Sequence, residues 1–314
     1  MNIEDKYGRS FKKLRISLLD ACNYKCVYCM PEGSVKFVHQ KDWLTGAQIT
    51  EAVRKLQANG IEEVRFTGGE PTLRSDFVEI IESVSKLPLK KIGITTNGHH
   101  LYKYLRELKE KTKLTSINIS LDSLQGEKFK RIAQIDGLDN VLRSIALAKE
   151  LGFDVKVNTV IINSLNNDEI LDFVEFAAEH KVDVRFLELM KIGVMKKHFH
   201  HYFLSADEII NMIKEKHSMH LVESAWDSTS FNYHLDNGSK IGFIASETKA
   251  FCTTCTRLRM GPKGDIRPCI MLPESISIKD RPDAEIPFIL KELLKEKPID
   301  RIESQDQNMF EIGG

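Results

Sequence analysis

Short apolar runs typical of strands alternate with longer amphipathic runs typical of helices from Lys13 to Leu189, and this alternation limits the fold more than any other feature. Repeated strand–helix units form parallel strands joined by right-handed crossovers. The expected strands are 14–18, 63–67, 91–95, 116–120, 155–162 and 183–189. The expected helices include 47–59, 76–86, 101–110, 138–151 and 168–180, with Gly60 and Gly152 as cap residues at two C-terminal ends.

Six strand–helix units are fewer than those of a closed eight-fold barrel, which takes about 250 residues. We therefore predict an α/β fold built on an incomplete (β/α)6, TIM-like barrel. Functional residues of such barrels lie at the C-terminal ends of the strands. Ser205 and Glu208 form a capping box that begins the next helix, and we expect two domains, 1–204 and 205–314.

The six cysteines fall into two groups of three, with none in the roughly 220 residues between the groups. Cys22, Cys26 and Cys29 have C-x3-C-x2-C spacing and follow the first expected strand. Cysteine thiolates hold Fe–S clusters, and three ligands would leave one iron of a four-iron cluster open. A structural zinc site would need four ligands, and disulfides would need an even number. Three unrelated reduced cysteines are the remaining alternative.

The second group is Cys252, Cys255 and Cys269, and a hairpin turn over 261–265 would return Cys269 to Cys255. A zinc site remains open here, with His234 as the nearest upstream fourth ligand. A second cluster with an open iron fits three cysteines better. His198, His200 and His201 form another cluster of metal-binding residue types, but their context favours a solvated loop.

Lys+Arg and Asp+Glu both number 45, so the formal net charge is zero. No global field favours nucleic acid or a membrane surface, and an anion site must come from a local basic cluster. No apolar run approaches the roughly 20 residues of a membrane span, and no signal peptide is visible. We expect a cytoplasmic protein with reduced thiols and neither a nucleic-acid nor a membrane partner.

The C-x3-C-x2-C spacing, with Tyr28 before the third cysteine, resembles the radical S-adenosylmethionine (SAM) enzymes. The second cysteine group resembles the branch of that family that cyclises GTP in molybdenum cofactor biosynthesis. The resemblance covers residues 13–314 and is weakest over 191–250. Ala21 replaces the usual arginine, and Leu189 replaces a usual aromatic residue. The implied fold is the radical SAM partial barrel, with a C-terminal α+β extension that closes the barrel mouth.

The resemblance also implies roles for single residues. All six cysteines would hold two [4Fe–4S] clusters. Residues implied to bind SAM are Tyr28, Gly69, Ser120 and Met190. Residues implied to contact GTP are Arg15, Arg65, Thr96, Lys156, Arg257, Leu258 and Arg259. The C-terminal Gly313 and Gly314 would reach into the active site and serve catalysis.

Each of these segments also has a simpler interpretation. Gly69 and Thr96 would each belong to a polar turn after a strand. Asp122, beside Ser120, would cap the following helix. Lys156 faces either the barrel lumen or solvent, and Met190 would be an ordinary core methionine. The resemblance favours the lumen for Lys156.

The implied reaction converts GTP to (8S)-3′,8-cyclo-7,8-dihydroguanosine 5′-triphosphate, and the implied class is a lyase. The implied partners are GTP, a flavodoxin- or ferredoxin-like electron donor and the downstream cyclic pyranopterin monophosphate synthase, and a homodimer is compatible with this function. One alternative is another radical SAM enzyme that modifies a peptide with an auxiliary cluster. The other is a zinc-stabilised nucleotide-binding module without catalysis.

Overall fold

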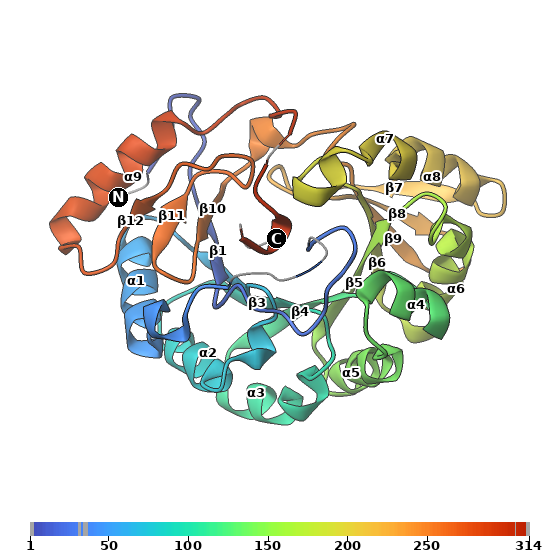
Figure 1. The fold of residues 1–314 in the computed structure, drawn as a ribbon, viewed down its shortest axis with the longest axis horizontal. Helices are drawn as coiled ribbons and strands as arrows, with labels where there is room; N and C mark the ends of the chain where they lie inside the picture. Colours follow the sequence, from blue (N-terminus) through green and yellow to red (C-terminus); the bar gives the residue numbers. More distant parts are fainter. Residues whose placement is uncertain (1–2, 31–32, 34–36, 305, 312–314) are drawn as a thin grey trace.

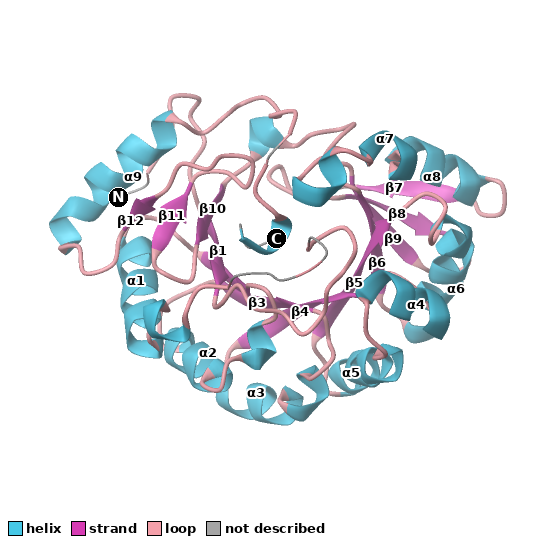
Figure 2. Ribbon diagram, in the orientation of Figure 1, coloured by secondary structure: helices cyan, strands magenta, loops and turns pink. Residues whose placement is uncertain are grey.

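The computed structural model describes residues 3–30, 33, 37–304 and 306–311. Parallel strands form the centre of its sheet in chain order (Figures 1 and 2). These strands are β1 (Lys13–Ser17), β2 (Glu63–Thr67), β3 (Lys91–Thr96), β4 (Leu114–Ser120), β5 (Asp154–Ile161) and β6 (Asp183–Glu188). The helices that cover their outer face are α1 (Gly46–Ala58), α2 (Phe77–Ser85), α3 (Leu105–Lys111), α4 (Gly126–Ala133), α5 (Leu138–Glu150) and α6 (Ile170–His180).

The C-terminal part of the chain extends both edges of this sheet. Beyond β1 lie β10 (Arg257–Met260), β11 (Asp265–Arg267) and β12 (Ile276–Ser277), and beyond β6 lie β9 (Lys240–Ile244), β8 (Phe231–Leu235) and β7 (Met219–Val222). β10 is parallel to β1 and β9 is parallel to β6, whereas the outer strands pair antiparallel. The sheet is open between β7 and β12, which confirms the predicted incomplete barrel with an α+β extension.

Three further helices belong to the extension: α7 (Phe199–Tyr202), α8 (Ala206–Lys214) and α9 (Ile286–Lys295). The last described turn, Met309–Glu311, lies in the mouth of the barrel at the red end of the chain (Figure 1). No helix among the described residues is long and apolar enough to cross a membrane. The sheet continues across residue 205, so the division into 1–204 and 205–314 stays a prediction.

Alternation along the strands separates the core from the lumen. On β5, Val155, Val157 and Ile161 are buried under the helices, while Lys156 and Asn158 share the opposite, inward face. The expected strand ends agree with the structure to within two residues. The expected helix 101–110 is instead a 3-10 turn, Leu101–Lys103, followed by α3.

The predicted helix ends are confirmed where a glycine or a capping box in the sequence marks them. Gly60 and Gly152 adopt φ values of +107° and +76°, the left-handed conformation that ends a helix most easily with glycine. Ser205 and Glu208 form the capping box of α8. The cap role of Asp122 is wrong: its carboxylate accepts from Val160 N and the Tyr28 hydroxyl, and Gln125 precedes α4 without a side-chain cap.

Candidate iron–sulfur and nucleotide site

The first cysteine loop leaves β1 and runs against the turn after β2. Gly69 N donates to Leu19 O (2.7 Å) and Glu70 N donates to Ala21 O (2.9 Å). A Cβ on Gly69 would lie 2.1 Å from the Ala21 carbonyl oxygen, and one on Gly68 would lie 2.4 Å from Leu19 O. Only glycines allow this approach, so the turn fixes the path of the loop that carries the cysteines.

Glu70 holds the turns after β2 and β3 together. It is fully buried, and its carboxylate accepts from the hydroxyls of Thr72 (2.6 Å) and Thr96 (2.7 Å) and from Asn97 N (2.7 Å). Thr96 therefore lines the cavity at the first cysteine group, with its hydroxyl committed to Glu70. The predicted GTP contact of Thr96 stays a prediction.

Cys22, Cys26 and Cys29 line one cavity of about 140 Å³. Burial, followed by the charge of Asp122 and the neighbouring thiolates, raises the pKa of Cys26. Burial likewise raises the pKa of Cys22 to about 11 and that of Cys29 to about 12. Without iron these groups hold their protons, so cluster binding must release protons and is coupled to pH.

Tyr28, Gly69 and Ser120, three of the residues predicted to bind SAM, line this first cavity. The Tyr28 hydroxyl donates to Asp122 Oδ2 (2.7 Å), and burial raises the pKa of Asp122 to about 6. Met190 lies further along, where a central cavity meets the second cysteine group.

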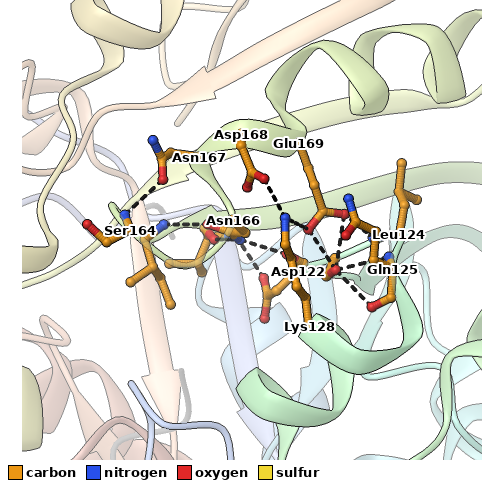
Figure 3. A network of polar contacts seen from close by, with 12 residues as sticks. Asp122, Leu124, Gln125, Lys128, Ser164, Asn166, Asn167, Asp168 and Glu169 are labelled. Carbon is orange, nitrogen blue, oxygen red and sulfur yellow. Dashed lines mark hydrogen bonds and ion pairs between the residues drawn. The ribbon is translucent and has the colours of Figure 1, made fainter.

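A polar network fixes the two loops that follow β4 and β5 (Figure 3). Asn166 Nδ2 donates to Asp122 O (2.6 Å), and Glu169 accepts from Leu124 N (2.7 Å) and from the Ser123 hydroxyl. Lys128 closes the network on Asp168 (2.6 Å). Because Asn166 and Glu169 are fully buried, these bonds are shielded from water and hold Asp122 in a fixed position beside the cavity.

Cys252, Cys255 and Cys269 line a second cavity of about 70 Å³. The predicted hairpin is confirmed: β10 and β11 pair antiparallel, with Arg259 opposite Arg267, and return the chain to Cys269. Burial alone would raise the pKa of Cys255, but Arg257 and Lys297 lower it to about 6. Burial and the two neighbouring cysteines raise the pKa of Cys252.

Within the described residues, no three His, Cys, Asp or Glu side chains converge tightly enough to hold a single metal ion. His234, the fourth ligand of the zinc alternative, lies on β8 opposite His220 and Lys240 and does not line the second cavity. The segment with His198, His200 and His201 forms α7 and its N-terminal flank and holds no such group either.

A central cavity of about 250 Å³ lies between the cavities at the two cysteine groups and shares lining residues with both. Tyr28 and Ser120 belong to both this cavity and the first, and Arg257, Arg259 and Met190 belong to both this cavity and the second. A ligand in the centre would therefore meet groups bound at both cysteine sites.

The arginines of the barrel wall form a row across neighbouring strands. Arg15 on β1 lies in register with Arg259 on β10 and with Arg65 on β2. Burial, then the charges of Arg259, Arg257 and Arg65, lowers the pKa of Arg15, which shows how closely these cations are gathered. Such a cluster of buried cations is unfavourable alone, and a bound anion would stabilise it.

Two other residues predicted to contact GTP, Lys156 and Leu258, have side chains that already interact within the protein. Lys156 faces inward as predicted, but its ammonium pairs with Asp154 (2.6 Å) and lies 3.7 Å from Asp183. The Leu258 side chain is buried in the core, so contact from this residue would come from its main chain. Gly313 and Gly314 lie outside the described residues, although Met309 and Phe310 line the first cavity.

Three further residues point to a bound polar ligand. Asn118 Oδ1, Asn158 Oδ1 and Arg185 Nε are buried, line the central cavity and have no hydrogen-bond partner among the described residues. Buried polar atoms are rarely left unpaired, so a ligand would complete them. Strand alternation places Asn158 on the lumen face, and the same reasoning applied to β4 and β6 would have found Asn118 and Arg185.

Comparisons with known proteins agree with this geometry. The Radical SAM superfamily model matches residues 16–177, and the Molybdenum Cofactor Synthesis C model matches residues 182–305. Streptococcus suis SuiB is 16% identical with a TM-score of 0.64, over 91% of this chain and 67% of SuiB. anSMEcpe with bound AdoMet is 18% identical with a TM-score of 0.57, over 91% and 81% of the two chains. Fold and cysteine sites define a radical SAM protein.

Curated relatives identify the branch of this superfamily to which the chain belongs. A GTP 3′,8-cyclase of Synechocystis is 41% identical over 99% of this chain and 94% of its own, and one of Aquifex aeolicus is 38% identical over 99% of both chains. Molybdenum cofactor biosynthesis protein moc-5 of Caenorhabditis elegans is 38% identical over 88% of this chain and 46% of its own. The chain belongs to the GTP 3′,8-cyclase family.

Proposed function

We propose that this protein converts GTP to (8S)-3′,8-cyclo-7,8-dihydroguanosine 5′-triphosphate in molybdenum cofactor biosynthesis, as a lyase. The observation that carries the proposal is that Arg15, Arg257 and Arg259 line the cavity between the two cysteine groups. The peptide-modifying alternative gives no reason for these arginines. SuiB, which binds a precursor peptide, shares only the fold with this chain.

In the proposed complex, Cys22, Cys26 and Cys29 hold a [4Fe–4S] cluster, and SAM lies in the first cavity against Tyr28, Gly69 and Ser120. When bound, the cluster and SAM would supply the radical chemistry that removes the 3′ hydrogen of the GTP ribose, and the residues that line the first cavity would hold them in place. The buried loops around Glu70 and Asp122 fix the walls of this cavity and keep water out.

The triphosphate would lie against Arg15, Arg257 and Arg259, because guanidinium groups form bidentate, charge-assisted bonds with phosphate. Cys252, Cys255 and Cys269 would hold a second [4Fe–4S] cluster, and this cluster would bind the guanine. Together these contacts would keep C3′ and C8 in near-attack geometry, which can supply several kcal/mol.

The remaining parts of the proposal follow from the function. A flavodoxin- or ferredoxin-like protein supplies electrons, and the cyclic pyranopterin monophosphate synthase takes the product. We place the enzyme in the cytoplasm, where thiols stay reduced, and a homodimer is compatible with it. Residues 1–204 would generate the radical, and residues 205–314 would bind the guanine.

The test is anaerobic. Reconstituted, dithionite-reduced protein is given SAM, and 5′-deoxyadenosine is followed with and without GTP. Product that rises with GTP and takes up deuterium from 3′-labelled GTP supports both the substrate and the abstraction site. SAM cleavage that ignores GTP would contradict the substrate. No cleavage, with zinc instead of iron, would contradict the radical chemistry.

A further inference from the structure

Lys297 lies two residues beyond the end of α9 and is only 3% exposed. Its Nζ donates to Cys255 Sγ (3.3 Å), Arg257 O (2.9 Å) and Pro268 O (2.5 Å). A protonated lysine has three N–H donors and a neutral one has two, so three acceptors match the ammonium. The geometry therefore places a buried positive charge on the sulfur of a cysteine in the second group.

No carboxylate among the described residues forms an ion pair with this ammonium. The charged groups around it are Cys255, Cys269 and the Arg257 guanidinium. A buried charge without a counter-ion is unfavourable. As cluster ligands, the cysteines of the second group would be thiolates, and their negative charge would compensate the ammonium of Lys297.

Arg9 fixes the main chain on both sides of this contact. It is 2% exposed and pairs with Asp5, and its Nη1 donates to Cys252 O and to Pro298 O (3.0 Å). Its Nη2 donates to Lys297 O (3.4 Å). One guanidinium thus ties the chain beyond α9 to the turn that carries Cys252, and Lys297 is held in place rather than reaching in from solvent.

The first cysteine group has the opposite surroundings. Cys22 Sγ accepts from neutral donors, Tyr24 N (3.4 Å) and Asn97 Nδ2 (3.7 Å). Its charged neighbourhood includes the buried carboxylates Glu70 and Asp122. Two cysteine groups with equal numbers of ligands therefore stand in different electrostatic environments, one near carboxylates and one against a lysine and an arginine.

We propose that Lys297 is a positioning residue that raises the reduction potential of the cluster held by Cys252, Cys255 and Cys269. Cluster potentials depend on net charge, on hydrogen bonds to the sulfurs and on solvent exposure. Reduction adds negative charge to the cluster, and a buried ammonium bonded to a ligand sulfur stabilises the reduced form. The inference rests on the proposed function in that this cysteine group holds a [4Fe–4S] cluster.

The experiment isolates that cluster in the full-length chain. Cys22, Cys26 and Cys29 are all replaced by Ala, so that the second group holds the only cluster, and this variant is the parent. Lys297→Gln, Lys297→Met and Lys297→Arg are added singly. Iron and sulfide are measured, and an EPR-monitored potentiometric titration gives the midpoint. Lys295→Met is the matched control, because Lys295 is exposed and pairs with Glu292 on α9.

Loss of the charge should lower the midpoint potential of the cluster by about 59 mV. For a one-electron couple, this means that the ratio of reduced to oxidised cluster at a fixed potential falls about ten-fold. This is expected for Lys297→Gln, which can still donate hydrogen bonds, and for Lys297→Met. Lys297→Arg and the control should keep the parent midpoint. Cluster loss in the neutral variants, with retention in Lys297→Arg, would also support the required charge.

Two results would overturn the inference, and they distinguish the role of Lys297 from the second cluster on which it rests. Full iron content with an unchanged midpoint in Lys297→Gln and Lys297→Met would show that Lys297 does not set the potential, while the second cluster would stand. A parent without iron and sulfide at the second group would instead overturn the second cluster itself, and the role of Lys297 with it.

Discussion

Gly93 on β3 lies directly beside the guanidinium of Arg65 on β2, and a Cβ on Gly93 would come within 2.8 Å of Arg65 Cζ. The space left by the missing side chain lets Arg65 lie across the sheet, where it donates to Ile94 O (2.7 Å) and to the Ser116 hydroxyl (3.1 Å). Burial, followed by the charge of Arg185, lowers the pKa of Arg65 to about 10, so this cation is held in a confined position.

Gly93→Ala should therefore displace Arg65 and weaken GTP binding. A hydrogen bond to a charged group is worth about 1.5–3 kcal/mol, so we expect KM for GTP to rise about ten-fold or more. SAM cleavage without GTP should change little. Gly126→Ala is the control, because a Cβ there meets no atom within 4 Å. An unchanged KM in Gly93→Ala would separate Arg65 from substrate binding.

Gly69→Ala should disturb the first cysteine loop. The new Cβ would lie 2.1 Å from the Ala21 carbonyl oxygen, and main chain cannot move aside as a flexible side chain can. We expect the reconstituted protein to lose about half of its iron, because the second cysteine group is untouched. Iron analysis and far-UV circular dichroism distinguish this local loss from unfolding. Full iron content would mean that the loop adapts.

Cys29→Ala and Cys269→Ala should remove different clusters and therefore have different effects on SAM cleavage. Each variant should keep one cluster, and total iron should fall by about half. Cys29→Ala should abolish SAM cleavage, because Tyr28, Gly69 and Ser120, which are predicted to bind SAM, line the cavity at the first group. Cys269→Ala should still form 5′-deoxyadenosine but lose its dependence on GTP. Equal loss of SAM cleavage in both variants would contradict separate roles.

The free energy of unfolding of the iron-free protein should fall as the pH rises and Asp122 loses its proton. Burial raises its pKa to about 6 from 3.8, so between these values the folded chain binds more protons than the unfolded chain. Stability is then lost as the pH rises through this window, by about 3 kcal/mol in total.

Asp122→Asn should remove this slope, which urea unfolding of the iron-free protein between pH 4 and pH 7 would measure. Asp168→Asn is the control, because it removes an exposed carboxylate of the same network (Figure 3). A slope that persists in Asp122→Asn would show that another group titrates.

The central strands could be predicted because their signals are local. Each of β1–β6 is a short apolar run followed by a helix, and glycine marks two helix ends. β7 has no such signal: its residues, Met219–Val222, are partly or fully exposed and do not alternate. Its place in the sheet comes from pairing with β8, and a single sequence does not encode that contact locally.

The residues of the site could likewise be predicted only where the signal is local in the sequence. The cysteines were found from their spacing, and Arg257 and Arg259 were named from the resemblance to the family. Lys297 was missed because it stands in an ordinary charged segment, Lys295-Glu296-Lys297, and only the fold brings it to Cys255. Asp122 was mistaken for a cap because its partners, Tyr28 and Val160, come from distant parts of the chain.

The strand that completes one side of the barrel is among the last to be synthesised. β1 pairs with β10, Lys13 opposite Arg257, and β6 pairs with β9. When β1–β6 have left the ribosome, the nascent chain therefore exposes two unpaired strand edges, at β1 and at β6. In other proteins such edges promote association between chains. Met309 and Phe310 line the cavity at the first cysteine group, so this cavity is complete only when the C-terminal end of the chain has been synthesised.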